Sequence, residues 1–375
     1  MPVAAIAAES EDDIADSIAD KIKDYREGEI DVPTGEHVRR WAGQFDPLVQ
    51  RSILVETRHF LEKRYISKGI AENFISGLSR NSNLAGRNPA TFWAGVGFLR
   101  LQERSQSQCD MLAILSDVLC NAFGVTCARQ TAANGVYVYI DDAIFSGRQV
   151  LDDLRRWING WDISDCTVHV ICIGSHKSGR WYAARELGRI AGLRQIDIRW
   201  WFDAEIEDWR KEGNGEKVDV LWPTYPPGKW CLSKNKGVYQ YVPSDQYVNN
   251  WWTKCPDDAK KFNPRPPFNG ERNLGFESEA GRGILEQAFL QRGAYICSLS
   301  ENPNKNMHPL GYHKLNGPGC GTLLTTYRNC PNNAPLVLWW GDQDASYPLN
   351  QWYPLMPRRT RTANRVDDLP EENAF

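Results

Sequence analysis

Several features that would assign this sequence to a class at once are missing. The formal net charge of the 375 residues is −3. The sequence therefore lacks the basic excess of a protein whose whole surface binds nucleic acid, although this net charge is compatible with a local basic patch. There is no apolar run of about 18 residues, which excludes a transmembrane helix. The first residues turn acidic before the apolar core of a signal peptide could form. We therefore expect a cytoplasmic protein without membrane contact.

Paired cysteine motifs are also missing. The ten cysteines stand singly, and none forms a Cys-x-x-Cys pair. Several lie inside apolar helix or strand patterns, as buried free thiols do. A reducing cytoplasm therefore fits better than a disulfide framework. His308, His313 and Cys320 come nearest to a metal cluster, but their spacing matches no zinc pattern.

The length predicts roughly two or three domains, with ample material for a core. We expect a helical segment at 1–85, an α/β core at 86–220, a mixed domain rich in Trp, Pro and Asn at 221–355, and a flexible tail, first basic and then acidic, at 356–375. The sequence has 15 tryptophans, most of them in its second half. Core packing explains such a set most simply, and aromatic platforms for bases are the alternative.

Hydrophobic periodicity predicts helices in the first segment and alternating strands and helices after it. Repeated strand–helix units form a mostly parallel sheet covered on both faces, and ligands bind beyond the carboxyl ends of its strands. Ser107, with Asp110 three residues on, is expected to cap a helix. The predicted helices are 11–25, 36–45, 47–65, 69–78, 107–123, 147–158, 179–191 and 281–292, and the predicted strands are 96–101, 125–128, 136–140, 167–173, 195–202, 323–327 and 336–340.

The most informative segment is an apolar strand followed by two adjacent carboxylates, a short loop ending in Ser-Gly, and a helix. Asp141 and Asp142 can hold the 2′- and 3′-hydroxyls of a ribose, directly or through Mg²⁺. The loop ends at a helix start, where unpaired N–H groups and the helix dipole attract a phosphate. Ser146 adds a hydroxyl, and Gly147 lets the backbone approach the anion closely. The pattern predicts a ribose 5-phosphate site; alternatively, the acids merely close a strand and Ser146 caps a helix.

This segment resembles the PRPP-binding signature of type I phosphoribosyltransferases: an apolar strand, two acids, three variable residues, Thr or Ser, and Gly. Phe145 stands where that family usually has a small or hydroxylated residue, and Gln149 replaces a usual Thr or Ser. The resemblance implies a sheet of type I phosphoribosyltransferase type, PRPP or a related ribose phosphate as ligand, and Mg²⁺ bound at Asp141 and Asp142. The loop and first helical turn implied to bind substrate are Ala143, Ile144, Phe145, Ser146, Gly147, Arg148 and Gln149.

Type I phosphoribosyltransferases grip pyrophosphate with a loop that follows an early strand. Residues 101–107 are in the matching position ahead of a helix. Arg104 could pair with a diphosphate as a catalytic residue, and Ser105 and Ser107 could donate hydrogen bonds to it. An exposed polar loop is the alternative.

Two further segments could contact substrate. His176, Lys177 and Arg180 lie in a predicted loop between a strand and a helix, where they could stabilise the leaving group or meet the acceptor. A solvated loop is the alternative. The other segment is a polar turn whose side chains could recognise a base, a nucleotide or a partner, although Asn and Pro make turns readily. Its candidate residues are Arg328, Asn329, Asn332 and Asn333.

The combination resembles the phosphoribosyltransferase-like proteins associated with bacterial conflict systems. The resemblance uses residues 41–45, 105–108, the acidic pair and the polar turn before Trp339, and it covers most of 36–342. It implies a role in antiphage defence as an effector alongside a retron or similar system, with a nucleic acid or a defence protein as a further partner. We expect transfer of ribosyl phosphate to an unknown acceptor with loss of pyrophosphate. The alternative is a catalytically inactive nucleotide-binding sensor or scaffold.

Overall fold

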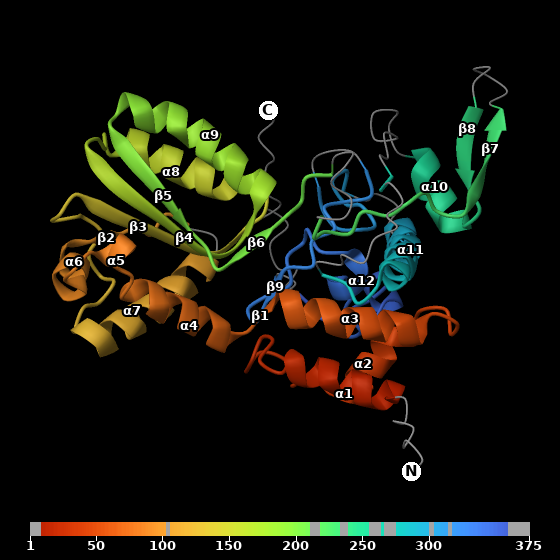
Figure 1. The fold of residues 1–375 in the computed structure, drawn as a ribbon. Helices are drawn as coiled ribbons and strands as arrows, with labels where there is room; N and C mark the ends of the chain where they lie inside the picture. The colour runs from red at the N-terminus through yellow and green to blue at the C-terminus, as the bar shows by residue number, and fades with distance from the viewer. Residues whose placement is uncertain are drawn as a thin grey trace, which may run out of the picture.

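The chain forms two lobes, one built on a parallel sheet and the other mainly helical (Figure 1). The computed structural model describes residues 9–102, 106–210, 218–232, 239–254, 264–265, 275–299, 304–313 and 317–358. Within these ranges, none of the helices combines the length and the apolar character needed to cross a membrane.

The central sheet is wholly parallel and has the strand order β2-β3-β4-β5, with β6 paired to β4 beyond the end of β5. Its strands alternate in the side chains that they present to the two faces. On β3, Val138 and Ile140 face one core and Tyr139 faces the other. The predicted mostly parallel α/β sheet is therefore confirmed. The strands are β2 (Gly97–Phe98), β3 (Val136–Ile144), β4 (Cys166–His176), β5 (Ile196–Trp201) and β6 (Ala204–Ile206).

Helices cover both faces of this sheet (Figure 1). On one face, Leu151 and Leu187 belong to the core around Tyr139. On the other, Ile75 and Leu115 belong to the core around Ile140. Each fully buried side chain of this kind contributes about 1.5–3 kcal/mol through removal of apolar surface from water. The covering helices are α8 (Arg148–Gly160) and α9 (Lys177–Leu193) on the first face, and α4 (Lys68–Ser79), α6 (Pro89–Gly95) and α7 (Gln106–Phe123) on the second.

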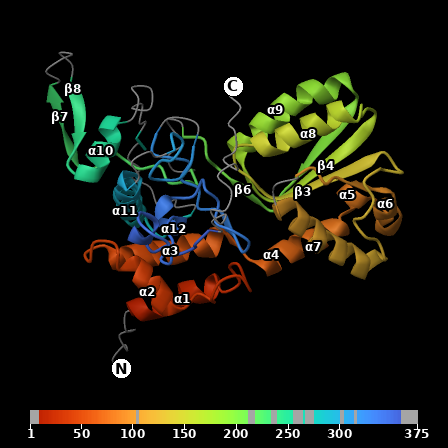
Figure 2. The same cartoon turned by 180° about the vertical axis from the view of Figure 1, so that it is seen from behind.

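The helical lobe joins the beginning of the chain to its second half (Figures 1 and 2). Ser10 begins α1 with a capping box, and Ile14 and Ile18 face the core one helical turn apart. Across that core, the indole Nε1 of Trp41 donates to the carbonyl of Val337 at 2.8 Å. The helices of this lobe are α1 (Glu11–Lys21), α2 (Gly35–Ala42), α3 (Gln50–Arg64), α11 (Glu279–Ser298) and α12 (Leu336–Trp339).

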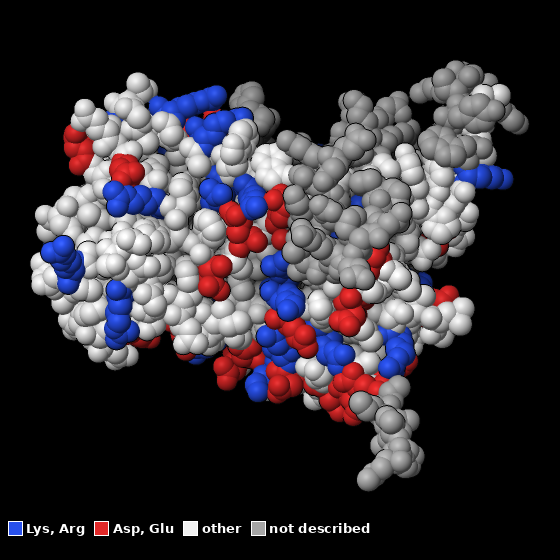
Figure 3. Space-filling view, viewed as in Figure 1, with Lys and Arg blue, Asp and Glu red and all other residues white. Residues whose placement is uncertain are grey.

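Short elements complete the structure. Strands β1 and β9 pair in parallel between the two lobes, and β7 and β8 form an antiparallel hairpin beside α10 (Figure 1). Charged side chains on the face shown in Figure 3 are of mixed sign along the junction of the lobes, without a broad single-sign field among the described residues. The short elements are β1 (Tyr65–Ile66), α5 (Ser82–Ala85), β7 (Gly228–Leu232), β8 (Tyr239–Pro243), α10 (Gln246–Lys254), β9 (Thr325–Thr326) and the 3₁₀ turn η1 (Leu349–Gln351).

Four predicted elements differ from the structure, and one of them, the strand predicted at 323–327, is reduced to the two residues of β9. The strand predicted at 96–101 is reduced to the two residues of β2, and 125–128 forms no strand. The segment predicted as a strand at 336–340 begins as the helix α12, because a short apolar run has no periodicity that separates a buried helix from a buried strand. The domain limits given above stay a prediction.

Candidate functional site

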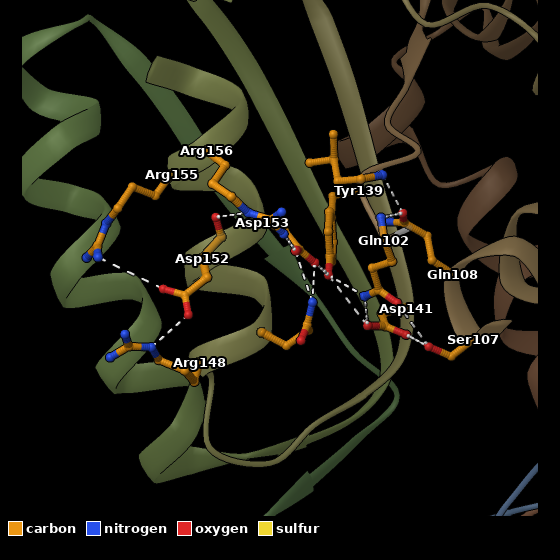
Figure 4. Close-up of polar contacts among 12 residues, drawn as sticks. Gln102, Ser107, Gln108, Tyr139, Asp141, Arg148, Asp152, Asp153, Arg155 and Arg156 are labelled. Carbon is orange, nitrogen blue, oxygen red and sulfur yellow. Dashed lines mark hydrogen bonds and ion pairs between the residues drawn. The ribbon is translucent and has the colours of Figure 1, made fainter. Parts of the chain in front are cut away.

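The two acids lie where the sheet borders the helical lobe, but within the last four residues of β3 rather than beyond the strand end predicted at 140, because β3 continues to Ile144. Asp141 is only 7% exposed. Its carboxylate accepts hydrogen bonds from the hydroxyl of Ser107 at 2.7 Å and from Nε2 of Gln102 at 2.6 Å (Figure 4). Burial, and next the charge of Asp142, raise the pKa of Asp141 to about 7, although the hydrogen bonds from Ser107 and Gln102 act in the opposite direction.

Behind Asp141 a second buried carboxylate belongs to the same polar network. The hydroxyl of Tyr139 lies 3.0 Å from Asp153 and 3.5 Å from Asp141. Nε2 of Gln149 donates to both oxygens of Asp153 at 2.9 Å. Arg156 donates to Asp153 at 2.6 Å (Figure 4). The amide donor of Gln149 is therefore engaged inside α8.

Asp142 contacts a side chain that lies far away in the sequence. The Nη1 of Arg328 donates to Asp142 at 3.1 Å, and its Nε donates to Asp110 at 3.0 Å. The side chain of Arg328 is 12% exposed and that of Asp142 is 22% exposed, so this pair is largely shielded from water, whereas Asp110 is 42% exposed. The polar turn of the second half thus reaches the acidic pair directly.

A cavity of about 1050 Å³ opens between the two lobes at this point. A volume of this order suits a ligand of nucleotide size or larger. A smaller hollow of about 200 Å³ follows the loop after the acids and is lined by Asp141, Ile144, Ser146 and Gly147. The two spaces share the lining residues Ala143, Phe145, Gln149 and Asn333.

Most of the residues predicted on the loop and the polar turn line these spaces. On the sheet side of the large cavity, Ser107 and Asp142 stand near Phe145, whose ring lies 5.4 Å from that of His176. On the opposite side lie the predicted turn residues Arg328, Asn329, Asn332 and Asn333. The sequence therefore identified two walls of one cavity, although it did not show that they face each other.

Two residues of the loop have local partners. The backbone N–H of Arg148 lies 3.3 Å from the exposed hydroxyl of Ser146. Ser146 does not cap α8, because the N-cap is Gly147 and the helix start has no side-chain cap. Arg148 itself pairs with Asp152 at 2.7 Å on the helix surface. The hydroxyl of Ser146 and the guanidinium of Arg148 would each give up these weak, exposed contacts to bind a phosphate at a small cost in free energy.

Gly147 is required for helix packing as well as for any anion. Its φ of 73° is left-handed, and a Cβ on it would lie 2.1 Å from the carbonyl oxygen of Gly179. Gly179 in turn approaches the carbonyl of Phe145, so the starts of α8 and α9 are in backbone contact. The close approach that the sequence attributed to an anion is therefore made here with α9.

Gly147→Ala is expected to destabilise the fold by about 2–5 kcal/mol, because left-handed strain and a backbone clash add together. Gly188→Ala is the matched control. Gly188 lies in α9 with no atom within 4 Å of the position of its Cβ, so alanine there should gain up to about 1 kcal/mol. Urea unfolding of both variants measures the contrast. Equal stability of Gly147→Ala and the wild type would contradict the packing role.

The basic segment predicted as a loop at 174–179 is not a loop. Strand β4 continues to His176 and α9 begins at Lys177. Lys177 pairs with Glu207 at 3.0 Å, and Arg180 pairs with Glu205 at 2.8 Å, which satisfies the basic charge within the fold. Neither side chain lines the two spaces described above.

His176 is buried between the two lobes rather than facing a ligand. One ring nitrogen lies 2.8 Å from the hydroxyl of Thr322 and the other lies 3.2 Å from Asp208. Burial alone would raise the pKa of Asp208, but hydrogen bonds from His176 and Ser178 outweigh it and lower that pKa. This arrangement joins the end of β4 to the second half of the chain.

The helix cap predicted at Ser107 is wrong. Helix α7 begins at Gln106, so Ser107 lies inside its first turn and donates to Asp141, while Asp110 pairs with Arg328. Arg104 and Ser105, predicted to grip a diphosphate, lie outside the described residues.

Sequence reasoning missed several residues of the site. Tyr139 stands two residues before Asp141 on the same face of a strand, and Asp153 stands four residues after Gln149 on a helix, so both could have been found by periodicity. Arg26, Lys68 and Arg358 also line the cavity, from three separate parts of the chain. No local pattern connects these three cations to the acids.

The carboxylates fit a hydrated magnesium ion better than a bare one. Each oxygen of Asp141 already has two possible donors near it. Each oxygen of Asp142 has one, from Arg328 or from the N–H of Ala143, and therefore keeps a free lone pair. Among the described residues, no group of three or more Asp, Glu, His or Cys side chains could hold a metal by itself. Magnesium that enters with a diphosphate needs only one or two carboxylates and keeps several waters.

A parallel sheet with an acidic pair ahead of a helix start, beside an open cavity with mixed polar and apolar lining, is the arrangement expected of a phosphoribosyltransferase-like protein. Residues 38–358 match the family model PRTase-CE, and the chain belongs to this family. This confirms the resemblance to the phosphoribosyltransferase-like proteins of the conflict-system type. No curated protein matches the chain.

Proposed function

We propose that the protein binds PRPP, or a related ribose phosphate, with Mg²⁺ and transfers the ribosyl phosphate to an acceptor with loss of pyrophosphate. It would then be a pentosyltransferase that acts as a cytoplasmic effector in a bacterial conflict system. The observation that carries the proposal is the acidic pair beside an open cavity of about 1050 Å³, with Asp142 lining this cavity and Asp141 lining the smaller hollow next to it. Membership of the PRTase-CE family supports the type of chemistry.

Different residues of the site would bind the ribose hydroxyls and the 5-phosphate of the ligand. Asp142 would accept hydrogen bonds from the ribose hydroxyls, because its oxygens keep free lone pairs. The backbone from Ser146 to Arg148 would receive the 5-phosphate at the start of α8, in the smaller hollow. Asp141 would hold Ser107 and Gln102 in place, and a ligand would reach it by displacing one of these donors.

Catalysis would consist mainly of positioning and electrostatic stabilisation. Departure of pyrophosphate from C1 breaks the C1–O bond and leaves positive charge on the sugar. The carboxylates at the end of β3 would stabilise that charge while Asp142 keeps the sugar fixed. Magnesium would supply neutralisation of the diphosphate charge. The acceptor would approach from the wall formed by Asn329 and Asn333.

A specific set of contacts favours the second candidate, a sensor or scaffold that binds a nucleotide without turnover. Arg328 already pairs with Asp142, and the amide donor of Gln149 is held by Asp153. The ring of Phe145 lines both spaces where a smaller side chain would leave more room. The first two contacts occupy polar groups that a transferred ribosyl group would use, and the ring of Phe145 takes up space that it would fill.

Calorimetry with PRPP and Mg²⁺ tests the proposal. The wild-type protein is expected to bind, and the Asp141→Ala/Asp142→Ala double variant is expected to lose binding at least a hundredfold, because both polar anchors of the ribose are removed. Asp117→Ala, an exposed acid on α7, is the matched control and should bind like the wild type.

Isotope-labelled PRPP then separates the two candidates. Release of pyrophosphate in the presence of a cell extract that contains acceptors supports a transferase. Binding without release supports the sensor. Unchanged binding by the double variant would defeat both assignments of the site.

A further inference from the structure

Arg358 is a largely buried cation that faces the cavity and has no acidic partner among the residues that the structure describes. It lines the large cavity, and its guanidinium lies 5.0 Å from the centre of the Trp339 ring. Its Nε is buried without a hydrogen-bond partner. Burial lowers the pKa of Arg358, and the titratable side chains that act on it are Cys330, Tyr25 and Tyr312, none of which is a carboxylate.

The backbone before Arg358 is anchored, so this side chain is not a loose surface arm. The N–H of Met356 donates to the carbonyl of Leu338 at 2.7 Å. The hydroxyl of Tyr25 lies 3.1 Å from the carbonyl of Met356, and Nη1 of Arg26 donates to the carbonyl of Pro357 at 2.9 Å. The fold therefore holds this guanidinium at the cavity wall.

The other cations of the cavity are engaged or exposed. Arg328 pairs with Asp110 and Asp142, and Arg26 pairs with Glu29 at 3.0 Å. Lys68 is exposed at the rim. Glu27 and Glu29 line the cavity too, but both are exposed to solvent. Within the ranges that the structure describes, Arg358 is thus the cavity cation that is both shielded from water and without a carboxylate.

An uncompensated buried charge is costly, and an anionic ligand removes much of that cost. A guanidinium matches a phosphate through two parallel hydrogen bonds. The same wall carries the amides of Asn329 and Asn333, and Oδ1 of Asn329 is buried without a hydrogen-bond partner. Amides of this kind both donate to and accept from the edge of a base.

We propose that the cavity has a second anion subsite, centred on Arg358, that binds the phosphate of a nucleoside 5′-phosphate, with Asn329 and Asn333 facing its base. The ligand is either a free nucleotide or the phosphorylated 5′ end of a strand. It is the acceptor if the proposed transfer takes place, and only its role as acceptor rests on the proposed function. The binding itself is independent of the acidic pair.

Calorimetry with the four ribonucleoside 5′-monophosphates, the four parent nucleosides and a 5′-phosphorylated trinucleotide tests this subsite. At least one monophosphate should bind the wild-type protein at least tenfold more tightly than its nucleoside. Arg358→Gln should lose at least tenfold in that affinity and should keep or raise Tm, because an uncompensated charge is removed. Arg87→Gln, which removes an exposed arginine, is the matched control and should bind normally.

The trinucleotide separates the two sources of phosphate: tighter binding than the monophosphate assigns the end of a strand, and equal or weaker binding assigns a free nucleotide. Arg358→Lys keeps the charge and should keep part of the affinity. The Asp141→Ala/Asp142→Ala variant should still bind the monophosphate although it no longer binds PRPP. The two measurements therefore test the subsite and the proposed function independently. The subsite is refuted if Arg358→Gln binds like the wild type, or if none of the phosphorylated probes binds the wild-type protein at millimolar concentration.

Discussion

Asp141→Asn is expected to stabilise the fold at pH 8 and, in the same protein, to weaken PRPP binding at least tenfold. The carboxyl group has a pKa of about 7 in the folded chain, against 3.8 as its ordinary value. The native state therefore binds the proton more tightly than the unfolded state. Stability falls as the pH rises between these two values, and the full loss is present above about pH 7.

An amide in place of the carboxylate avoids this loss. The difference between the two pKa values corresponds to at most about 4 kcal/mol, so the variant should gain up to this amount at pH 8 and clearly less at pH 5. Gln102 and Ser107 can reorient to suit the amide, because a side-chain amide and a hydroxyl both donate and accept hydrogen bonds. The loss of PRPP binding follows from loss of the negative charge beside the sugar.

Urea unfolding at pH 5 and pH 8 measures the stability effect, and calorimetry measures PRPP binding. Asp117→Asn on the surface of α7 is the control, with almost no change expected in either measurement. If the variant is less stable than the wild type at pH 8, the ionised carboxylate of Asp141 stabilises the fold, and the prediction is contradicted.

Glu286→Ala is expected to cause a large loss of stability, about 3–5 kcal/mol, by breaking a buried ion network. Glu286 on α11 is fully buried and pairs with Arg282 at 2.9 Å and with Arg265 at 3.1 Å. It also accepts from the backbone N–H of Trp222 at 2.9 Å. Its removal leaves two buried guanidinium groups without this carboxylate.

Thermal and urea unfolding check this loss against Asp20→Ala. Asp20 pairs with Lys23 on the surface, where the two side chains are 76% and 65% exposed, so its loss should cost less than about 1 kcal/mol. Glu286→Ala should not alter PRPP affinity at a temperature where it remains folded, because Glu286 does not line the cavity. A loss no larger than that of Asp20→Ala would contradict the importance of the network.

The parallel sheet and its covering helices could be predicted because their signals are local. Strands β3 and β4 are apolar runs, and each is followed by a helix with a buried stripe. The acidic pair lies near the C-terminal end of a strand for the same reason, although β3 runs on past it to Ile144. The error at 336–340 shows the limit of such signals, because Leu336, Val337 and Leu338 are all buried and give no period.

Some of the predicted site residues lie at the cavity, and others lie outside it. Except for Arg148, the residues from Ala143 to Gln149 line the cavity or the smaller hollow beside it, and the predicted turn residues from Arg328 to Asn333 line the cavity. Both segments stand out in the sequence by composition. Lys177 and Arg180 were predicted from their charge and their place between a strand and a helix, but neither feature shows that Glu205 and Glu207 lie beside them.

The sequence by itself determined the alternation of strands and helices around β3 and β4, the position of Asp141 and Asp142 near the C-terminal end of β3, and the family, because these depend on neighbours in the chain. Only the tertiary structure decided that Arg328 meets Asp142, 186 positions away, and that Tyr25 anchors the segment before Arg358 from 331 positions away. Local periodicity tells which face of an element is apolar, but not which distant segment will cover it. The cavity between the lobes exists only through such distant contacts.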